Sequence, residues 1–193
     1  MSKWNHKRTV MRDYNETAHL YDMRYAEEQE AKYKEAFEDL EVARHNVVLD
    51  VGCGTGLLFR HVAPKTEMVV GVDISRNLLL KAKTRAEQHP EVHAVQADAD
   101  HLPFKTEVFS LIFAFTVLQN MPKPLETLQE IKRASKADAF IVVTGLKKVF
   151  SLISFADMLE EAGLLVFSFR DADLLKCYVA VAVKNLKKIS CSG

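Results

Sequence analysis

Three glycines at alternate positions, Gly52, Gly54 and Gly56, directly follow an apolar run at residues 47–51. Apolar side chains of a helical type begin again at Leu57. Glycine is needed where a chain turns sharply or where a ligand must approach bare backbone, because any Cβ would obstruct it. A strand that leads through such a turn into a helix is the place where open α/β sheets bind nucleotides. The segment therefore predicts a ligand loop at the carboxyl end of a strand.

The spacing of these glycines separates the classes of nucleotide ligand. A dinucleotide fold has its third glycine at the position of Leu57, and that frame fails here. A Walker loop requires Lys and then Ser or Thr after its last glycine, and neither follows Gly56. What remains is a turn for a ligand that carries an amino group and no phosphate. Asp50, two residues before the first glycine, either binds that amino group, directly or through water, or holds the N–H groups of the loop.

Four segments, in order along the chain, resemble the motifs of class I S-adenosylmethionine-dependent methyltransferases. They read LDVGCGTG at residues 49–56, VGVDIS at 70–75, QADADHLPF at 96–104 and FSLIFAFTVLQNM at 109–121. Within that family the chain looks most like the ubiquinone and menaquinone biosynthesis type, on the tract 14–25 and the sequence at 102–104. The resemblance implies S-adenosylmethionine as cofactor, S-adenosylhomocysteine as product, and a seven-stranded sheet.

The resemblance also implies a role for residues at two further strand ends. It implies that Asp73 accepts both ribose hydroxyls while Ile74 packs on adenine. It implies that Asp98 accepts from the adenine amino group while the N–H of Ala99 meets the ring. A glycine loop alone is more often an ordinary turn than a site, but three such features at successive strand ends rarely coincide. The expected cofactor-binding residues are Tyr21, Asp50, Gly52, Cys53, Gly54, Gly56, Asp73, Ile74, Asp98, Ala99 and Phe115.

The acceptor side carries no evident catalytic group. Methyl transfer from a sulfonium is an in-line displacement whose leaving group needs no help, so the protein mainly aligns the nucleophile and excludes water. A base is expected for a hydroxyl or amine acceptor of high pKa, whereas alignment suffices for a carbanion, thiol or aromatic nitrogen. The catalytic residue stays unassigned, and no metal is expected. The candidates, chosen because they should surround the mouth, are Tyr14, Tyr25, Thr116, Gln119 and Asn120.

The residues Tyr14, Ala18, Tyr21 and Tyr25 recur at spacings of four, three and four, which places them on one face of a helix. Aromatic residues at helical spacing mainly bury area. The functional alternative is an aromatic face beside the sulfonium, a favourable cation–π arrangement. Tyr21 is the first choice for that role, because the family's comparable tract folds over the pocket.

The amino-terminal charges are unevenly placed. Residues 1–12 hold four basic side chains and no acid, whereas residues 13–41 hold ten acids. Asp13 with Glu16 three residues on is a capping-box pattern, which predicts that the first of two short helices begins there. We expect a solvated basic arm before a helical cap. Should the arm order over the pocket, its cations would be placed to meet a carboxylate, a phosphate or an RNA backbone; they are Lys7, Arg8 and Arg12.

From residue 47, short apolar runs alternate with helical patterns, as in a parallel sheet with crossover helices. The runs are residues 47–51, 68–72, 92–95, 109–115, 140–143, 164–169 and 177–183. The last two are joined by a connection too short for a parallel crossover, which predicts an antiparallel closing pair. Helix starts are expected after Ser75, at Pro122 to Pro124 and after Ser154, with Gly163 as the last stop. The predicted fold is α/β: a Rossmann-like, doubly wound, seven-stranded, mostly parallel sheet with an antiparallel last strand, helices on both faces and an amino-terminal helical cap.

The composition bounds the remaining possibilities. The 193 residues suit one domain, divided into a cap at 1–41, a core at 47–183 and a polar tail at 184–193. The 26 basic side chains cancel the 26 acidic ones, so no overall field gathers nucleic acid. No apolar run approaches the roughly 20 residues of a bilayer span and no secretory signal is present, so we expect a cytoplasmic protein without a membrane. Three scattered cysteines, Cys53, Cys177 and Cys191, predict reduced thiols.

Three functions stay open at this point. The family context favours an enzyme that methylates a small molecule. Residues 145–153 leave no room for an inserted lid, and an open mouth would suit an RNA or protein substrate with a partner subunit. The third is a non-catalytic cofactor-binding module. It stays open because this chain departs from the family's fourth strand, which usually opens Phe-Asp and ends Leu-His-His. This chain has Ser110 and the pair Gln119-Asn120 at those places. The acceptor and the oligomeric state do not follow from the sequence.

Overall fold

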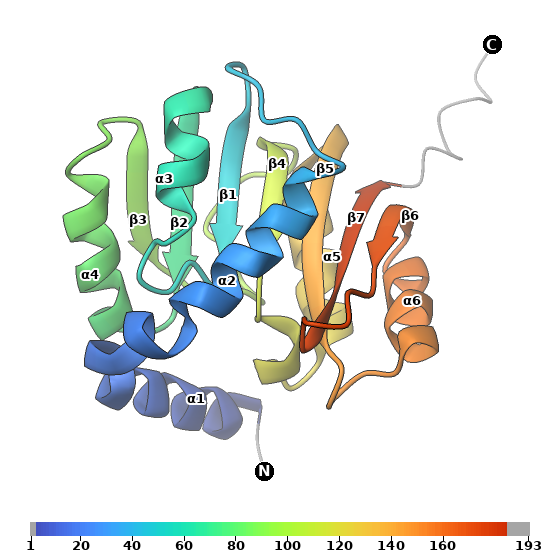
Figure 1. Ribbon diagram of the computed structural model, residues 1–193, viewed down its shortest axis with the longest axis horizontal. Coiled ribbons are helices and arrows are strands. Elements are labelled where there is room, and N and C mark those ends of the chain that lie inside the picture. Colours follow the sequence, from blue (N-terminus) through green and yellow to red (C-terminus); the bar gives the residue numbers. More distant parts are fainter. Residues whose placement is uncertain (1–2, 185–193) are drawn as a thin grey trace.

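The computed structural model describes residues 3–184, which form a seven-stranded sheet with helices on both faces (Figure 1). The strands lie in the order β3-β2-β1-β4-β5-β7-β6. Their bounds are β1 Val47–Val51, β2 Met68–Asp73, β3 Val92–Gln96, β4 Phe109–Ala114, β5 Ser135–Leu146, β6 Leu164–Arg170 and β7 Cys177–Lys184. Cys191 and nearly all of the expected tail lie outside the described residues.

The sheet reverses its winding direction at β1. This strand pairs in parallel with β2 on one side and with β4 on the other. In open α/β sheets such a reversal leaves a crevice beyond the carboxyl ends of the strands. At the far end, β7 is antiparallel to both β5 and β6. The predicted doubly wound sheet with its antiparallel closing pair is thus confirmed.

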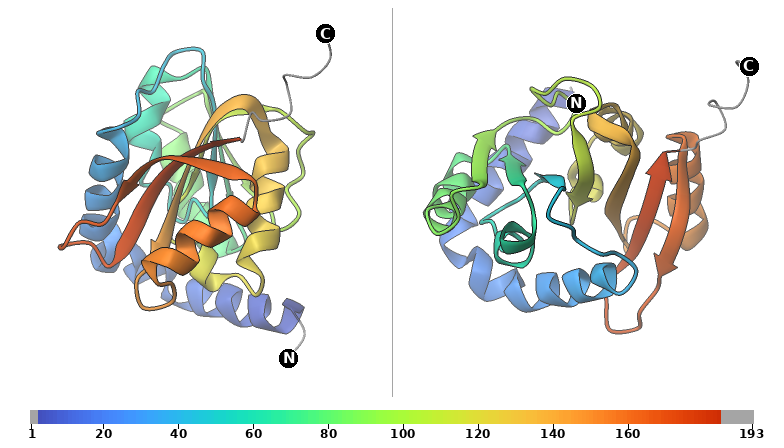
Figure 2. Two further views of the ribbon diagram at one scale, coloured as in Figure 1. Left: turned by 90° about the vertical axis from the view of Figure 1, so that its right-hand side faces the viewer. Right: turned by 90° about the horizontal axis from the view of Figure 1, so that it is seen from above.

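Helices cover the two faces of the sheet and its carboxyl edge. One face carries α2 (Tyr21–Phe37), α3 (Phe59–Val62) and α4 (Arg76–Ala86), and the other carries α5 (Pro124–Ala134) and α6 (Leu152–Glu161). The helix α1 (Lys3–Thr17) lies across the carboxyl ends of the strands, below the sheet in Figure 1 and along the bottom of the left-hand view in Figure 2.

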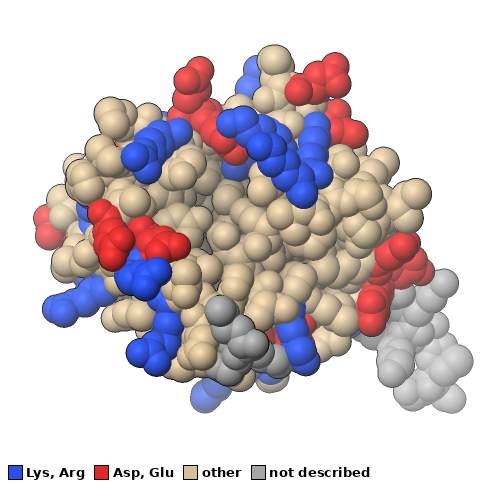
Figure 3. Space-filling view, turned by 90° about the horizontal axis from the view of Figure 1, so that it is seen from below, with Lys and Arg blue, Asp and Glu red and all other residues tan. Residues whose placement is uncertain are grey.

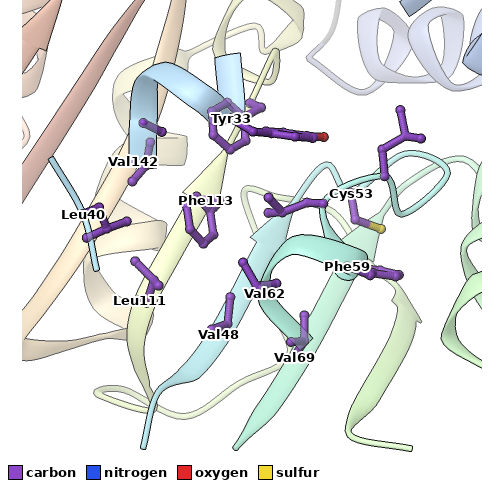
Figure 4. Close-up of a cluster of buried hydrophobic side chains, with 14 of the residues drawn as sticks. Tyr33, Leu40, Val48, Cys53, Phe59, Val62, Val69, Leu111, Phe113 and Val142 are labelled. Carbon is purple, nitrogen blue, oxygen red and sulfur yellow. The ribbon is translucent and has the colours of Figure 1, made fainter. Parts of the chain in front are cut away.

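The hydrophobic core under α2 and α3 packs against β1 close to where that strand leads into the glycine loop. Tyr33 of α2, Phe59 of α3 and Phe113 of β4 are buried there around Val48 and Cys53 (Figure 4). Full burial of side chains of this size stabilises a fold by about 1.5–3 kcal/mol each. The loop that leaves β1 therefore starts from a rigid base.

Local signals mark several helix ends as expected. Ser75 caps α4 by accepting the N–H of Leu78 at 3.3 Å, and Pro124 opens α5. Gly163 follows α6 with a φ of +73°, the left-handed conformation in which glycine ends helices. The expected start of α6 after Ser154 is wrong by one turn, because Ser151 caps the helix and accepts the N–H of Ser154 at 3.1 Å.

The amino terminus differs from the prediction. The helix α1 begins at Lys3, so the pair Asp13 and Glu16 lies inside a helix and opens none. A short 3₁₀ turn, Ala18–Leu20, then joins α1 to α2. The expected solvated arm is also wrong, because the Lys7 side chain is buried, with only 6% of the residue exposed. Packing of α1 across the strand ends overrides the local capping signal.

Candidate active site

A crevice lies at the carboxyl ends of β1, β2, β3 and β4, with α1 as its roof. Lys7, Val10 and Tyr14 line it from α1. The expected cofactor residues that line it are Tyr21, Gly52, Gly54, Asp73, Ile74, Asp98, Ala99 and Phe115. Asp50, Cys53 and Gly56 do not line it. Of the acceptor-side candidates, Tyr14, Thr116 and Asn120 line the crevice, whereas Tyr25 and Gln119 do not.

The glycine loop is held in a left-handed conformation that only glycine adopts readily. At Gly54 φ is +56°, and an added Cβ would lie 3.3 Å from the ring of Tyr21. At Gly56 φ is +78°, and an added Cβ would lie 2.5 Å from the ring of Phe59. Gly54 therefore presents bare backbone beneath an aromatic ring in the crevice. Gly56 serves the packing of Phe59 instead, and the thiol of Cys53 is buried in the same cluster.

The carboxylate of Asp73 links the glycine loop to the end of β2. One oxygen accepts the N–H of Gly54 at 2.9 Å, and the other accepts the N–H of Ser75 at 2.8 Å. Burial raises the pKa of Asp73 to about 6, although these N–H bonds act in the opposite direction. Each carboxylate oxygen has a second lone pair, so Asp73 can still accept hydrogen bonds from a ligand in the crevice.

Asp50 is buried behind the loop, with 3% of the residue exposed. Burial, and next the charge of Asp73, raise the pKa of Asp50 to about 8. The loop N–H groups of Gly52 and Cys53 bond to the carbonyl of Val72 and not to Asp50. Among residues 3–184 no donor reaches the Asp50 carboxylate, so it does not serve to hold the loop. A cationic group close by would compensate its charge.

The end of β3 brings a pair of carboxylates together with a lysine. Lys7 Nζ donates to both oxygens of Asp98, at 2.6 and 2.7 Å, and forms an ion pair with Asp100 at 2.5 Å. The sequence analysis placed Lys7 over the pocket only as the alternative to a solvated arm, and that alternative holds for Lys7 but not for the exposed Arg8 and Arg12. A signal for this placement was present, because Lys7, Val10 and Tyr14 are spaced by three and four and extend the tyrosine face toward the amino terminus.

Three tyrosines of the predicted face contact one another in succession, and two of them, Tyr14 and Tyr21, line the crevice. The rings of Tyr14 and Tyr21 have centroids 6.2 Å apart, and those of Tyr21 and Tyr25 are 5.0 Å apart. Burial raises the pKa of both Tyr14 and Tyr21 above its ordinary value, which keeps their phenols neutral. Tyr25 is 40% exposed and stays outside the crevice.

The end of β4 forms the remaining wall. Thr116 has a φ of +63°, which costs a β-branched residue roughly 1–3 kcal/mol unless its surroundings hold it. Its N–H donates to Thr144 at 2.8 Å, and its hydroxyl accepts from Lys32 at 2.9 Å and Gln29 at 3.3 Å. Lys32 is 2% exposed and pairs with Glu28 at 2.9 Å. Neither Lys32 nor Gln29 was predicted, since they stand in an acidic helical stretch without a motif.

Asn120 joins this wall to the roof. Its side-chain amide donates to the Tyr14 hydroxyl at 3.1 Å and to the Thr116 carbonyl at 3.0 Å, and its backbone carbonyl oxygen lies 3.1 Å from His6 Nε2. Farther along α1, the side-chain oxygen of Asn15 accepts from the Ser75 hydroxyl at 2.7 Å. The roof is therefore attached at the ends of both β2 and β4.

The described residues contain no group of three or more His, Cys, Asp or Glu side chains that could hold a metal ion. No helix within residues 3–184 combines the length and the apolar character that a bilayer crossing requires.

Comparison with known proteins places these features in a family. Residues 49–143 match a family model described as a methyltransferase domain. The chain is 28% identical over 152 residues to the malonyl-[acyl-carrier protein] O-methyltransferase of Marinomonas sp., covering 77% of this chain and 55% of that protein. It is 33% identical over 139 residues to the (+)-O-methylkolavelool synthase of Herpetosiphon aurantiacus, covering 70% and 49%. The chain thus spans about half the length of the curated relatives it matches.

Solved structures show the same fold at low identity. A SAM-dependent methyltransferase from Aquifex aeolicus superposes with a TM-score of 0.69 at 19% identity, over 77% of this chain and 87% of that one. A Haloferax volcanii protein solved in complex with the methyltransferase activator Trm112 superposes with a TM-score of 0.80 at 17% identity, over 90% and 96%. Taken with the four motifs and the sheet order, these matches show that the chain belongs to the class I S-adenosylmethionine-dependent methyltransferase family.

Proposed function

We propose that this protein transfers the methyl group of S-adenosylmethionine to a small-molecule acceptor. The observation that carries the proposal is the convergence of Asp73, Asp98 and the bare backbone at Gly54 on one crevice. The ubiquinone and menaquinone type suggested by the sequence is compatible with it. Demethylmenaquinone methyltransferase of Staphylococcus aureus is 34% identical over 113 residues, which is 56% of this chain and 46% of that protein.

The residues of the crevice fit the cofactor in character. The free lone pairs of Asp73 suit ribose hydroxyls, and Asp98 with the N–H of Ala99 suits the edge of adenine. Asp50 does not line the crevice but lies behind the glycine loop without a donor among residues 3–184, so it suits the positive amino group of the methionine part through its charge or a bridging water. When bound, the cofactor supplies a methyl group activated by a sulfonium.

At the acceptor end, the protein acts mainly by aligning the acceptor with the methyl group. The wall formed by Tyr14, Thr116 and Asn120 offers hydroxyl and amide groups, and burial raises the pKa of the Tyr14 phenol. None of these three is a base near neutral pH. Such a site suits an acceptor that is already nucleophilic, such as a carboxylate, thiolate, carbanion or aromatic nitrogen. The residues hold the acceptor in line and exclude water.

A small acceptor is favoured over RNA by the roof and by the charge distribution. The helix α1 covers the crevice and leaves less room than the open mouth expected from the sequence. On the face seen from below, basic and acidic side chains are interspersed around a broad uncharged area (Figure 3). A continuous basic track is what an RNA backbone would require. We place the enzyme in the cytoplasm, in line with two buried, unpaired cysteines at Cys53 and Cys177.

Calorimetry with S-adenosylhomocysteine tests the cofactor part of this proposal. We expect saturable one-site binding, and an absence of binding would overturn it. For the transfer itself, cell extract is incubated with the protein and tritium-methyl S-adenosylmethionine, and the small-molecule, RNA and protein fractions are counted separately. Label that depends on the protein and appears in the small-molecule fraction supports the proposal. Label confined to RNA or protein contradicts the acceptor class, and binding without any label favours the non-catalytic module.

A further inference from the structure

The roof helix contributes a buried cation to the crevice at the end of β3. Lys7 Nζ lies 2.6 and 2.7 Å from the two oxygens of Asp98 and 2.5 Å from Asp100 Oδ2. The side chains of Lys7 and Asp100 are each 7% exposed, and that of Asp98 is 18% exposed. One ammonium therefore serves two carboxylates that stand two residues apart.

The remaining hydrogen bonds show what this arrangement leaves available. Asp98 Oδ1 accepts the N–H of Asp100 at 3.0 Å in addition to Lys7. Asp100 is held on its other oxygen by the hydroxyl of Thr127. Asp98 Oδ2 has Lys7 as its one hydrogen-bond partner among residues 3–184. Since a carboxylate oxygen accepts two hydrogen bonds, Oδ2 keeps one position for a donor in the crevice.

Lys7 also partly balances the negative charge of the two carboxylates at this end of the crevice. Without a cation, the neighbouring carboxylates of Asp98 and Asp100 would repel one another. Partly buried carboxylates that lose their cationic partner are strongly disfavoured. With Lys7 in place, the Asp98 carboxylate is fixed through both oxygens, so that its free position points in one direction. A fixed acceptor discriminates between ligands, whereas a carboxylate free to rotate adapts to them.

We propose that Lys7 is a positioning residue for the cofactor, which holds the Asp98 carboxylate so that the crevice selects a 6-aminopurine over a 6-oxopurine. The inference rests on the proposed function, because it takes the adenine of S-adenosylmethionine as the ligand at Asp98. The 6-amino group of adenine donates to the free position of Oδ2. The 6-oxo group of hypoxanthine offers an acceptor to that same oxygen and is rejected.

The test compares two ligands on matched variants. Binding of S-adenosylhomocysteine and of S-inosylhomocysteine is measured by calorimetry for the wild type, Lys7→Met and Arg8→Met. Arg8 is exposed on the same helix, so Arg8→Met removes the same charge without touching Asp98. For Lys7→Met we expect the affinity for S-adenosylhomocysteine to fall about tenfold or more, and the preference over the inosyl compound to shrink by a similar factor. Arg8→Met should keep both values.

Two outcomes would contradict the inference, and a third would contradict the proposed function. If Lys7→Met weakens both ligands equally and leaves the preference unchanged, Lys7 merely closes the roof and the inference is wrong. If Lys7→Met binds S-adenosylhomocysteine more tightly, the ammonium competes with adenine and the inference is again wrong. If the wild type binds neither ligand, the proposed function itself fails.

A double variant covers the case in which Lys7→Met does not fold. Lys7→Met with Asp100→Asn removes one charge of each sign, so no like-charged pair remains, yet Asp98 still lacks its cation. The expected result is the same loss of preference for the 6-amino compound, with an unfolding midpoint close to that of the wild type. A retained preference in this variant would count against the inference.

Discussion

The Asp50 carboxyl has its pKa raised by burial and next by the negative charge of Asp73, which couples the acid inside β1 to the acid at the end of β2. The glycine loop runs between these two strands. Any ligand that brings positive charge to the loop will therefore act on both groups.

The pH dependence of stability follows from these two acids. The pKa of Asp50 is about 8 in the folded protein against an ordinary value of 3.8, and that of Asp73 is about 6. Between pH 4 and 8 the folded state thus retains protons that the unfolded state has released. The free energy of unfolding should fall as pH rises through this window, by at most about 1.4 kcal/mol per pH unit for each group. Urea unfolding at several pH values measures it.

Asp50→Asn is the matched variant for that measurement. Of the two acids, it removes the one whose pKa differs more between the folded and unfolded states, and it keeps the side-chain volume. The free energy of unfolding of this variant should therefore vary less between pH 6 and 8 than that of the wild type. Titrating groups that do not interact with Asp50 contribute equally to both proteins and cancel in the difference. Parallel pH profiles for the two proteins would show that Asp50 is not the cause.

Asp73→Ala should weaken binding of S-adenosylhomocysteine by at least about tenfold. It removes an acceptor for ribose and also the two backbone hydrogen bonds, from Gly54 and Ser75, that shape the loop. Asp13→Ala is the control, because Asp13 is an exposed acid on the outside of α1. Calorimetry compares them, and an affinity of Asp73→Ala equal to the control's would refute the assigned role.

Gly54→Ala should destabilise the protein by about 1–2 kcal/mol and displace the ring of Tyr21. The cost arises from the φ of +56° and from the 3.3 Å approach of the new Cβ to that ring. Tyr21→Leu offers a smaller side chain, so the double variant should recover part of the loss. A double-mutant cycle on unfolding free energies measures this, and strict additivity would show that the two residues do not touch.

Lys32→Met should reduce methyl transfer more than cofactor affinity. Lys32 holds the strained Thr116 on the acceptor wall and pairs with Glu28, while none of the three lies at the adenine or ribose end. Loss of the buried pair should also cost about 1–3 kcal/mol, because Glu28 remains partly exposed. Lys34→Met, exposed on the same helix, is the control. Labelling rate and S-adenosylhomocysteine affinity are measured on both, and an equal fall of the two quantities would contradict this placement.

The parts of the fold that could be predicted are those specified by neighbouring residues. The strand at residues 47–51 agrees at both ends with β1, and Ser75, Pro124 and Gly163 mark helix ends by their own local chemistry. The strand β5 was predicted at 140–143 but runs from Ser135 to Leu146. Its first half contains Lys136 and Asp138 at the exposed end of the sheet, which masks the apolar pattern.

The site was predictable only where strand ends define it. Gly54 was expected from the glycine spacing after the first strand, and Asp73 and Asp98 from the resemblance of two further strand ends to the family's motifs. Parallel strands bring these ends to one edge of the sheet. Lys32 was not expected there, and Lys7 only as the alternative to a solvated arm. Each reaches the crevice wall through a tertiary contact about 90 residues away in sequence, with Thr116 and Asp98 respectively. The capping pattern at Asp13 misled the prediction, since it describes a helix start that packing of α1 removes.

The attachment of α1 at both Lys7 and Asn15 has a kinetic consequence. A nucleoside-sized molecule must displace this segment or pass beneath it on the way in and again on the way out. Exchange of spent for fresh methyl donor would then set a ceiling on turnover that is the same for every acceptor, however reactive.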